Sequence, residues 1–276
     1  VMYTVGGVAL LGFILFLRAL FMTQSQPTAG DSPIPTPPPP PTMYPQTPAP
    51  DFTPTVAPPY WLGLPIEVSG GAQLAVSGQH IWVTDRIGGG LHSADGGATW
   101  SAITLPSGTR WIAAAPDIEY EIERGLFAAA ADGVHRSIDA GTTWQPILTS
   151  PGSEFTSVDV SMDGTIFVSE RESCAVRRAT DDGSTWTKFQ VTPDGCTLAR
   201  VLVWPLSHDG RQLYALGADY GLWRSVDRGA TWTMISPGYH ADLAFDPVNA
   251  SQFYTVDGNS VSWFWEEYNL WRDPVP

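Results

Sequence analysis

The sequence predicts an all-β fold: a five-bladed β-propeller of four-stranded blades, preceded by one N-terminal transmembrane helix and a proline-rich linker. Three observations predict it. An eight-residue segment ending in tryptophan recurs at spacings of 44, 42 and 46 residues. Short runs of β-forming residues surround each copy, four runs to a repeat, and no helical periodicity appears after residue 60. An apolar run of about 20 residues opens the chain.

The apolar run, residues 1–23, is predicted to be a retained membrane anchor. About 20 apolar residues at ~1.5 Å rise span the hydrocarbon core of a bilayer. A cleaved signal peptide is the alternative, but its apolar region is shorter and a small-residue cleavage site follows it. Arg18 lies inside the run, where it either snorkels to the headgroups or faces a partner helix. We therefore expect a single-pass protein whose propeller lies on the extracytoplasmic side, periplasmic or extracellular.

Residues 24–59 are predicted to form an extended linker, and residues 60–276 the propeller domain. The linker holds 14 of the 25 prolines. Such a segment cannot bury enough apolar area to fold, and it favours polyproline II, whose ~3.1 Å rise per residue gives a reach on the order of 100 Å.

The charge of the predicted propeller argues against a nucleic-acid partner. The chain has 14 basic and 28 acidic side chains, and residues 60–276 hold 13 and 26 of them. Binding to phosphate backbones needs a basic surface. The negative charge is read either as a means of staying soluble or as an acidic docking face for a basic partner.

Four segments in this part of the chain align without gaps. They are SADGGATW (Ser93–Trp100), SIDAGTTW (Ser137–Trp144), ATDDGSTW (Ala179–Trp186) and SVDRGATW (Ser225–Trp232). Their glycine-rich composition is typical of hairpin turns, which places each segment between the third and fourth strands of a blade. The pattern S-x-D-x-G-x-T-W resembles the Asp-box, or BNR repeat, of sialidase-like propellers. The resemblance covers residues 70–275, and only Ala179 departs from the pattern.

The residues of this motif are interpreted as structural. The aspartates can accept backbone N–H bonds within their turns, the glycines permit a positive φ, and the tryptophans can fill the base of each blade. The positions concerned are Asp95, Gly97 and Trp100; Asp139, Gly141 and Trp144; Asp181, Gly183 and Trp186; and Asp227, Gly229 and Trp232. If the tryptophan rings are fully buried, replacing one by alanine costs about 3–5 kcal/mol.

A fifth, degenerate unit follows from about His240. Its strands read ADLAF, QFYTV and VSWFW, and Glu266 and Tyr268 stand where the motif has Asp and Gly. Five units account for the whole sequence, so we expect five blades. Ring closure in propellers usually borrows a strand from the other terminus, and Tyr60–Val68 is available to pair with the last blade.

The two cysteines are candidates for a disulfide. Cys174 precedes the third strand of the third blade, and Cys196 lies in the link to the next blade. Those two connections emerge on the same face of a propeller, and an extracytoplasmic location permits oxidation. The alternative is two unrelated thiols.

No catalytic, cofactor or metal site is predicted. A sialidase needs an arginine triad, a tyrosine–glutamate pair and an acid aspartate, and the nearest match to its Arg-Ile-Pro signature is Arg86-Ile87-Gly88. No histidine shows metal-ligand spacing with another histidine or cysteine. His92 and His135 are expected at similar third-strand positions. Phosphate loops and dinucleotide fingerprints are absent.

Three functions remain open. The first is a non-catalytic subunit that supports interaction, stabilisation or assembly in a larger membrane protein complex, photosynthetic or respiratory. The repeats look like those of the photosystem II stability and assembly-factor family, although the resemblance does not identify the complex. The second is a cell-surface propeller that binds a glycan or an undefined small ligand, and the third is a sialidase-like hydrolase. In the first case the anchor, linker and propeller would all contact partner subunits and the lipid bilayer. Candidate contact residues are Arg18, Trp263, Trp265 and Trp271, with core packing as the alternative for the tryptophans.

Overall fold

The computed structural model describes residues 73–85, 88–116, 125–192, 195–205, 207–246, 252–257, 260–265 and 270–272. The predicted anchor (1–23), with Arg18, and the predicted linker (24–59) lie outside these residues. A search of the described residues finds no helix long and apolar enough to cross a membrane.

The described residues form five four-stranded antiparallel sheets, each with its strands in chain order. Blade 1 contains β1 (Gln73–Ser77), β2 (His80–Thr84), β3 (Gly89–Ser93) and β4 (Ser101–Thr104); blade 2 contains β5 (Trp111–Ala114), β6 (Leu126–Ala130), β7 (Gly133–Ser137) and β8 (Gln145–Thr149). Blade 3 contains β9 (Phe155–Val160), β10 (Ile166–Glu170), β11 (Ala175–Ala179) and β12 (Thr187–Gln190); blade 4 contains β13 (Leu198–Val203), β14 (Leu213–Gly217), β15 (Leu222–Ser225) and β16 (Thr233–Ser236). Blade 5 contains β17 (Asp242–Phe245), β18 (Gln252–Val256), β19 (Val261–Trp265) and β20 (Leu270–Arg272). The predicted five-bladed propeller is thus confirmed.

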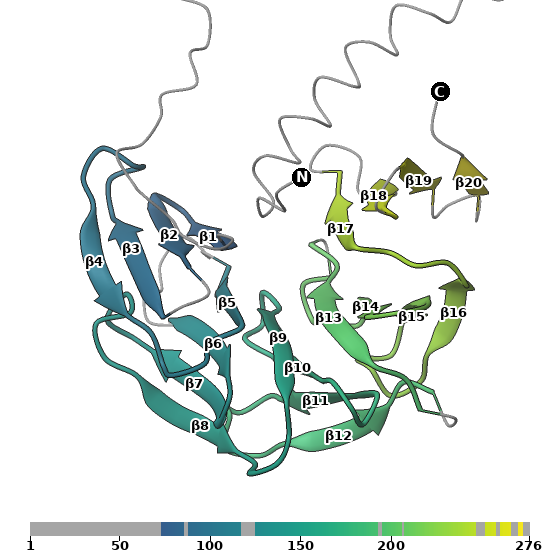
Figure 1. The fold of residues 1–276 in the computed structure, drawn as a ribbon, viewed down its shortest axis with the longest axis horizontal. Coiled ribbons are helices and arrows are strands. Elements are labelled where there is room, and N and C mark those ends of the chain that lie inside the picture. The colour runs from purple at the N-terminus through teal and green to yellow at the C-terminus, as the bar shows by residue number, and fades with distance from the viewer. Residues whose placement is uncertain are drawn as a thin grey trace, which may run out of the picture. The chain divides into compact units, whose positions relative to one another are not determined.

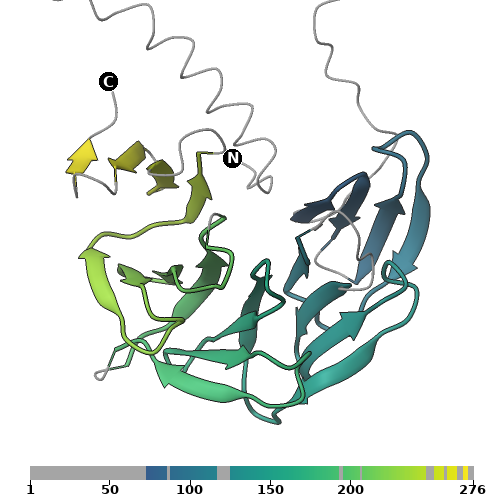
Figure 2. The same ribbon diagram turned by 180° about the vertical axis from the view of Figure 1, so that it is seen from behind.

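The blades follow one another around a common centre, with the first strand of each innermost (Figure 1). Neighbouring blades touch through these inner strands, β1 with β5, β5 with β9, and β9 with β13. Figure 2 shows the same order from behind. All five residues are buried in each of β6, β10 and β14, because the second strand of a blade is covered on both faces. This double burial explains why β6 and β14 contain no charged residue and why β10 begins with three consecutive apolar residues.

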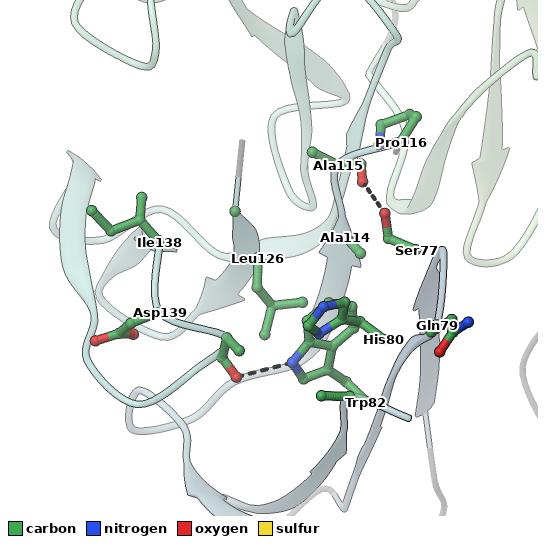
Figure 3. Close-up of a pocket in the computed structure, with 13 residues that line it drawn as sticks. Ser77, Gln79, His80, Trp82, Ala114, Ala115, Pro116, Leu126, Ile138 and Asp139 are labelled. Atoms are coloured by element: carbon green, nitrogen blue, oxygen red, sulfur yellow. Dashed lines mark hydrogen bonds between the residues drawn. The ribbon is translucent and has the colours of Figure 1, made fainter. Parts of the chain in front are cut away.

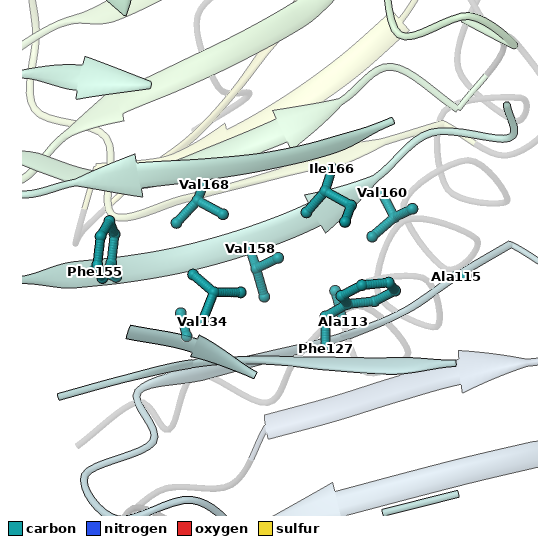
Figure 4. Close-up of a cluster of buried hydrophobic side chains, with 10 residues drawn as sticks. Ala113, Ala115, Phe127, Val134, Phe155, Val158, Val160, Ile166 and Val168 are labelled. Carbon is teal, nitrogen blue, oxygen red and sulfur yellow. The ribbon is translucent and has the colours of Figure 1, made fainter. Parts of the chain in front are cut away.

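The hydrophobic core is divided into four layers, each held between two adjacent blades. Figure 4 shows the layer between blades 2 and 3, where Phe127 and Val134 face Phe155, Val158 and Val168. A blade therefore has no core of its own, and its stability depends on its neighbours.

Blade 5 differs from the sequence prediction at its outer edge. Its first three strands lie where the sequence placed them. The fourth strand is Leu270–Arg272, which directly follows them in the chain and pairs with β19. The proposed borrowed strand, Tyr60–Val68, and the motif positions Glu266 and Tyr268 lie outside the described residues.

Cys174 and Cys196 are joined by a disulfide, with their Cα atoms 4.7 Å apart. Cys174 directly precedes β11, and Cys196 lies between β12 and β13. The bridge ties the third strand of blade 3 to the link that leads into blade 4.

Arg200 of β13 joins three blades near the centre. Its guanidinium carbon lies 4.2 Å from the centre of the Trp111 ring of β5. It also forms an ion pair with Asp242 of β17, and both side chains are about one-fifth exposed. Burial raises the pKa of Asp159 on β9, while the backbone N–H of Val203 and the charge of Arg200 oppose the rise. The innermost strands are therefore cross-linked by charge as well as by apolar packing.

We expect Arg200→Ala to lower the free energy of unfolding by about 2–4 kcal/mol. The substitution leaves the half-buried carboxylate of Asp242 without its ion-pair partner and removes the guanidinium that lies over the Trp111 ring. Guanidinium chloride unfolding followed by tryptophan fluorescence measures the change. Arg211→Ala is the matched control, since its ion pair with Asp209 is exposed, and it should cost at most about 0.5 kcal/mol. Equal, small losses in both variants would contradict the bridging role.

The disulfide closes a loop of 22 residues. In the chain-entropy model such a loop contributes about 3 kcal/mol by restricting the unfolded chain. The double variant Cys174→Ser/Cys196→Ser should lose that amount in chemical unfolding, and dithiothreitol should destabilise only the parent chain. If dithiothreitol leaves the unfolding midpoint of the parent chain unchanged, the bridge does not form in solution.

Candidate functional site

Each of the four repeat segments that resemble the Asp-box, called Asp-box turns below, forms a turn closed by its own side chains. In blade 2, Oδ1 of Asp139 accepts the backbone N–H of Thr143 at 2.8 Å, and Oδ2 accepts the Thr143 hydroxyl at 2.6 Å. Ser137 Oγ accepts the N–H of Gly141 at 2.8 Å and donates to Asp139 at 2.7 Å. The same bonds recur around Asp95 and Asp227, and Asp181 accepts the N–H of Thr185.

Two consecutive residues of each turn have positive φ. In blade 2 they are Ala140 (59°) and Gly141 (94°), and the N–H of Thr142 bonds to the carbonyl of Asp139, as in a type I′ turn. The glycine is also needed for space, since a Cβ on Gly183 would lie 2.9 Å from the Ile147 side chain of the preceding blade. Sequence reasoning anticipated the glycine but missed the left-handed residue before it.

The Asp-box carboxylates are stabilised in their ionised form. The hydroxyl and N–H of Thr143 lower the pKa of Asp139 to about 2, and those of Thr99 do the same for Asp95. The pKa of Asp181 is lowered by Thr185; for Asp227, burial acts upward but the turn's hydrogen bonds outweigh it. Carboxylates engaged in this way are poor proton donors near neutral pH.

All four motif tryptophans are partly exposed, and Trp144, Trp186 and Trp232 pack against core layers between neighbouring blades. The indole N–H of Trp144 donates to the carbonyl of Thr104 in β4 of the preceding blade, at 2.8 Å. That of Trp186 donates to Ile147 of β8 and to Gly183. Because all four tryptophans are partly exposed, the condition of full burial is not met. Replacing one by alanine should therefore cost less than replacing a fully buried tryptophan.

In three blades an aromatic residue of the second strand lies directly opposite an arginine of the third strand. The pairs are Phe127 with Arg136, Phe167 with Arg178 and Tyr214 with Arg224, and the corresponding pair in blade 1 is Trp82 with His92. His92 and His135 both lie on third strands, β3 and β7, as expected. Register aligns His92 with Arg136, one position from His135, so the two histidine side chains point to opposite faces of their blades. His135 instead lies 2.8 Å from the carboxylate of Asp132.

A cleft of about 530 Å³ lies on the seam between blades 1 and 2. Figure 3 shows Ser77, Gln79, His80 and Trp82 on the blade 1 side, and Leu126 with the Ile138–Asp139 turn on the blade 2 side. The indole N–H of Trp82 crosses the seam to the carbonyl of Ala140 at 3.0 Å, and Ser77 Oγ donates to Ala115 at 2.8 Å.

His80 and Trp82 line the blade 1 side of this cleft, and both stack with His92, which is not a lining residue. His80 and His92 are nearly parallel to each other and to Trp82, with ring centres 5.0–5.6 Å apart. Nδ1 of His80 lies 2.9 Å from Nε2 of His92, so one imidazole donates to the other. Burial lowers the pKa of His92, and the neighbouring His80 lowers it further. The sequence placed His92 on a third strand but assigned no site role to either histidine or to Trp82. Comparison of the repeats would have singled out the His92 position, because the other three copies have arginine there.

The predicted contact tryptophans in blade 5 are only partly described. Trp263 is half-buried on β19, whereas its neighbour Phe264 is fully buried in the layer between blades 4 and 5. Trp265 and Trp271 lie on β19 and β20, but their side chains fall outside the described residues. Within the described ranges, no group of three or more His, Cys, Asp or Glu could hold a metal ion.

No family model and no curated protein matches the chain. Solved structures are similar in fold. A streptogramin B lyase is 14% identical with a TM-score of 0.59 and covers 75% of this chain and 69% of its own. YCF48 from Cyanidioschyzon merolae is 16% identical with a TM-score of 0.54 and covers 73% and 68%. The GH74 enzyme of Niastella koreensis is 17% identical with a TM-score of 0.57 and covers 69% of this chain. The chain spans only 36% of that enzyme's length. At these identities the similarity shows the propeller fold, which enzymes and other proteins share.

We expect Asp139→Asn to destabilise the propeller in a pH-dependent way. A folded-state pKa of about 2, below the unfolded value, contributes stability above about pH 4 that is lost as the pH falls towards 2. The difference in unfolding free energy between the parent chain and Asp139→Asn should therefore be constant near neutral pH and shrink over that interval.

Urea unfolding at a series of pH values measures the difference. The control is Asp182→Asn in the next turn, because the Asp182 carboxylate is exposed and makes only a 3.4 Å ion pair with Arg136. A constant difference for Asp139→Asn down to pH 2 would contradict the assigned role of the carboxylate.

Proposed function

We propose that the chain is a non-catalytic, membrane-anchored propeller that serves as an interaction, stabilising or assembly subunit of a larger membrane protein complex. The observation that carries the non-catalytic part is the Asp-box geometry. The carboxylates that the repeats place at the blade turns are held by hydrogen bonds within those turns. They are therefore engaged in holding the fold together, and are poorly placed to act as acids or bases in a reaction.

The membrane part of the proposal rests on the sequence. An apolar run of about 20 residues and a proline-rich segment precede the sheets. The repeats resemble those of the photosystem II stability and assembly-factor family, and YCF48 is among the solved structures of similar fold. A propeller tethered in this way would meet its partners at the membrane surface, on the extracytoplasmic side.

A second candidate is a glycan- or ligand-binding propeller at the cell surface. The cleft between blades 1 and 2 favours it, because a half-enclosed space with aromatic and polar groups is a general binding feature. The two candidates predict different results when the protein is purified from the membrane: a complex subunit is recovered with partner proteins, and a ligand-binding propeller is recovered without them.

The test is purification of the tagged full chain in mild detergent, followed by mass spectrometry. We expect a membrane protein complex in stoichiometric amounts, and recovery as a lone monomer would overturn the proposal. The matched control is a tagged chain of residues 1–59, which lacks the propeller and should lose partners that the propeller holds. Specific binding on a glycan array would favour the second candidate, and turnover of a fluorogenic sialoside would contradict the non-catalytic assignment.

A further inference from the structure

The residue immediately before each Asp-box is arginine in blades 2, 3 and 4 but histidine in blade 1. It is Arg136 in blade 2, Arg178 in blade 3 and Arg224 in blade 4, but His92 in blade 1. In every case this residue pairs across the strands with an aromatic residue. The repeats thus supply an internal comparison for the blade 1 position.

In blades 2 and 3 the arginine bridges the seam to the next blade. Arg136 lies over the Phe127 ring at 5.8 Å and reaches the carboxylate of Asp182 at 3.4 Å. Arg178 donates to the carbonyl oxygen of Arg228 at 3.0 Å. Asp182 and Arg228 occupy the same place in their turns, directly before the motif glycine. Arg178 lies over the Phe189 ring of β12, in the fourth strand of its blade, at 4.7 Å. In both blades the arginine therefore lies over an aromatic ring and binds the turn of the following repeat.

Blade 1 lacks this arginine, and its seam holds the cleft. His92 is too short to cross the seam and is directed instead to His80, at 2.9 Å. The equivalent acceptor in the next turn is Ala140, which is reached by the indole N–H of Trp82. A carbonyl oxygen has two lone pairs, so Ala140 can accept a second hydrogen bond.

We propose that the cleft between blades 1 and 2 receives an arginine side chain of a partner protein, in the place that the repeat's own arginine takes in blades 2 and 3. The guanidinium lies against the His80–Trp82 stack and donates to the Ala140 carbonyl, and its aliphatic stem packs on Ala114 and Leu126. This assignment rests on the proposed role as an interaction subunit and specifies one chemical feature of the partner.

The chemistry of the cleft favours arginine over lysine. A planar guanidinium stacks on aromatic rings and donates sideways from a fixed fork, whereas an ammonium is a strongly hydrated point charge. The chain carries a net charge of −14, which attracts a cation. Asp139 lines the rim and stays ionised. Its carboxylate points away from the stack in Figure 3, so it contributes to the negative potential without direct contact.

The test uses the full chain in detergent, with the peptides acetyl-Gly-Arg-Gly-amide and acetyl-Gly-Lys-Gly-amide as probes. The readout is the NMR signal of the Trp82 indole N–H. We expect the arginine peptide to shift this signal with a Kd of about 1–10 mM, the range for a single well-placed side chain, and the lysine peptide to bind at least about tenfold more weakly. Absence of a saturating shift with the arginine peptide, or equal shifts with both, would overturn the proposal.

Two variants should close the cleft. His92→Arg restores the arginine of the other repeats, and should abolish the peptide-induced shift while raising the melting temperature. Ala114→Leu fills the floor without adding charge, and provides a second reading should His92→Arg disturb the fold. Thr187→Arg on the exposed strand β12 adds the same charge elsewhere and should bind the peptide as the parent chain does. Unchanged peptide binding in both cleft variants would show that the peptide binds another surface.

The same variants separate this inference from the proposed function. If a membrane complex accompanies the parent chain and is lost from His92→Arg but kept by Thr187→Arg, both stand. If the complex accompanies His92→Arg equally well, the arginine site is wrong and the interaction role survives. If no complex accompanies any chain, the interaction role fails, and the peptide titration alone decides whether the cleft binds arginine.

Discussion

A four-stranded sheet with two apolar faces cannot bury both of them by itself, and the rest of this structure depends on that constraint. The second strands β6, β10 and β14 are buried along their whole length. Each blade can satisfy them only by packing against a blade on either side, which arranges the sheets around a centre and divides the core into seams. The charged contacts of Arg200 then join three of the inner strands where the seams converge.

The Asp-box turn is what allows one blade to approach the next. Its two left-handed residues reverse the chain tightly, and the missing side chain of Gly183 leaves room for Ile147 of the preceding blade. Both carboxylate oxygens of the motif aspartate accept hydrogen bonds within the turn, as in Asp139. Because every copy must meet this requirement, the motif describes how the blades are built, and what the protein recognises has to come from positions at which the repeats differ.

The blade 1 seam is such a position. In blades 2 and 3 an arginine of the chain lies over an aromatic ring and binds the following turn, while in blade 1 His80 and Trp82 line an open cleft. Stacked rings and a backbone carbonyl are suited to holding a flat cation. An imidazole can also act as a general base, so these groups by themselves fit recognition and catalysis alike. The propeller fold, shared with lyases and GH74 enzymes, is neutral on this point.

The sequence by itself determined the blade count, most of the strands and the turn chemistry, because these are local features repeated at a regular spacing. It also named the Asp-box residues and the two cysteines. Only the tertiary structure decided that the motif tryptophans are partly exposed, that Leu270–Arg272 completes blade 5, and that Arg200 reaches Trp111 and Asp242. The same holds for the cleft beside His80 and His92. The contacts of Arg200 and Trp82 join residues tens of positions apart, and local pattern says nothing about how neighbouring blades meet.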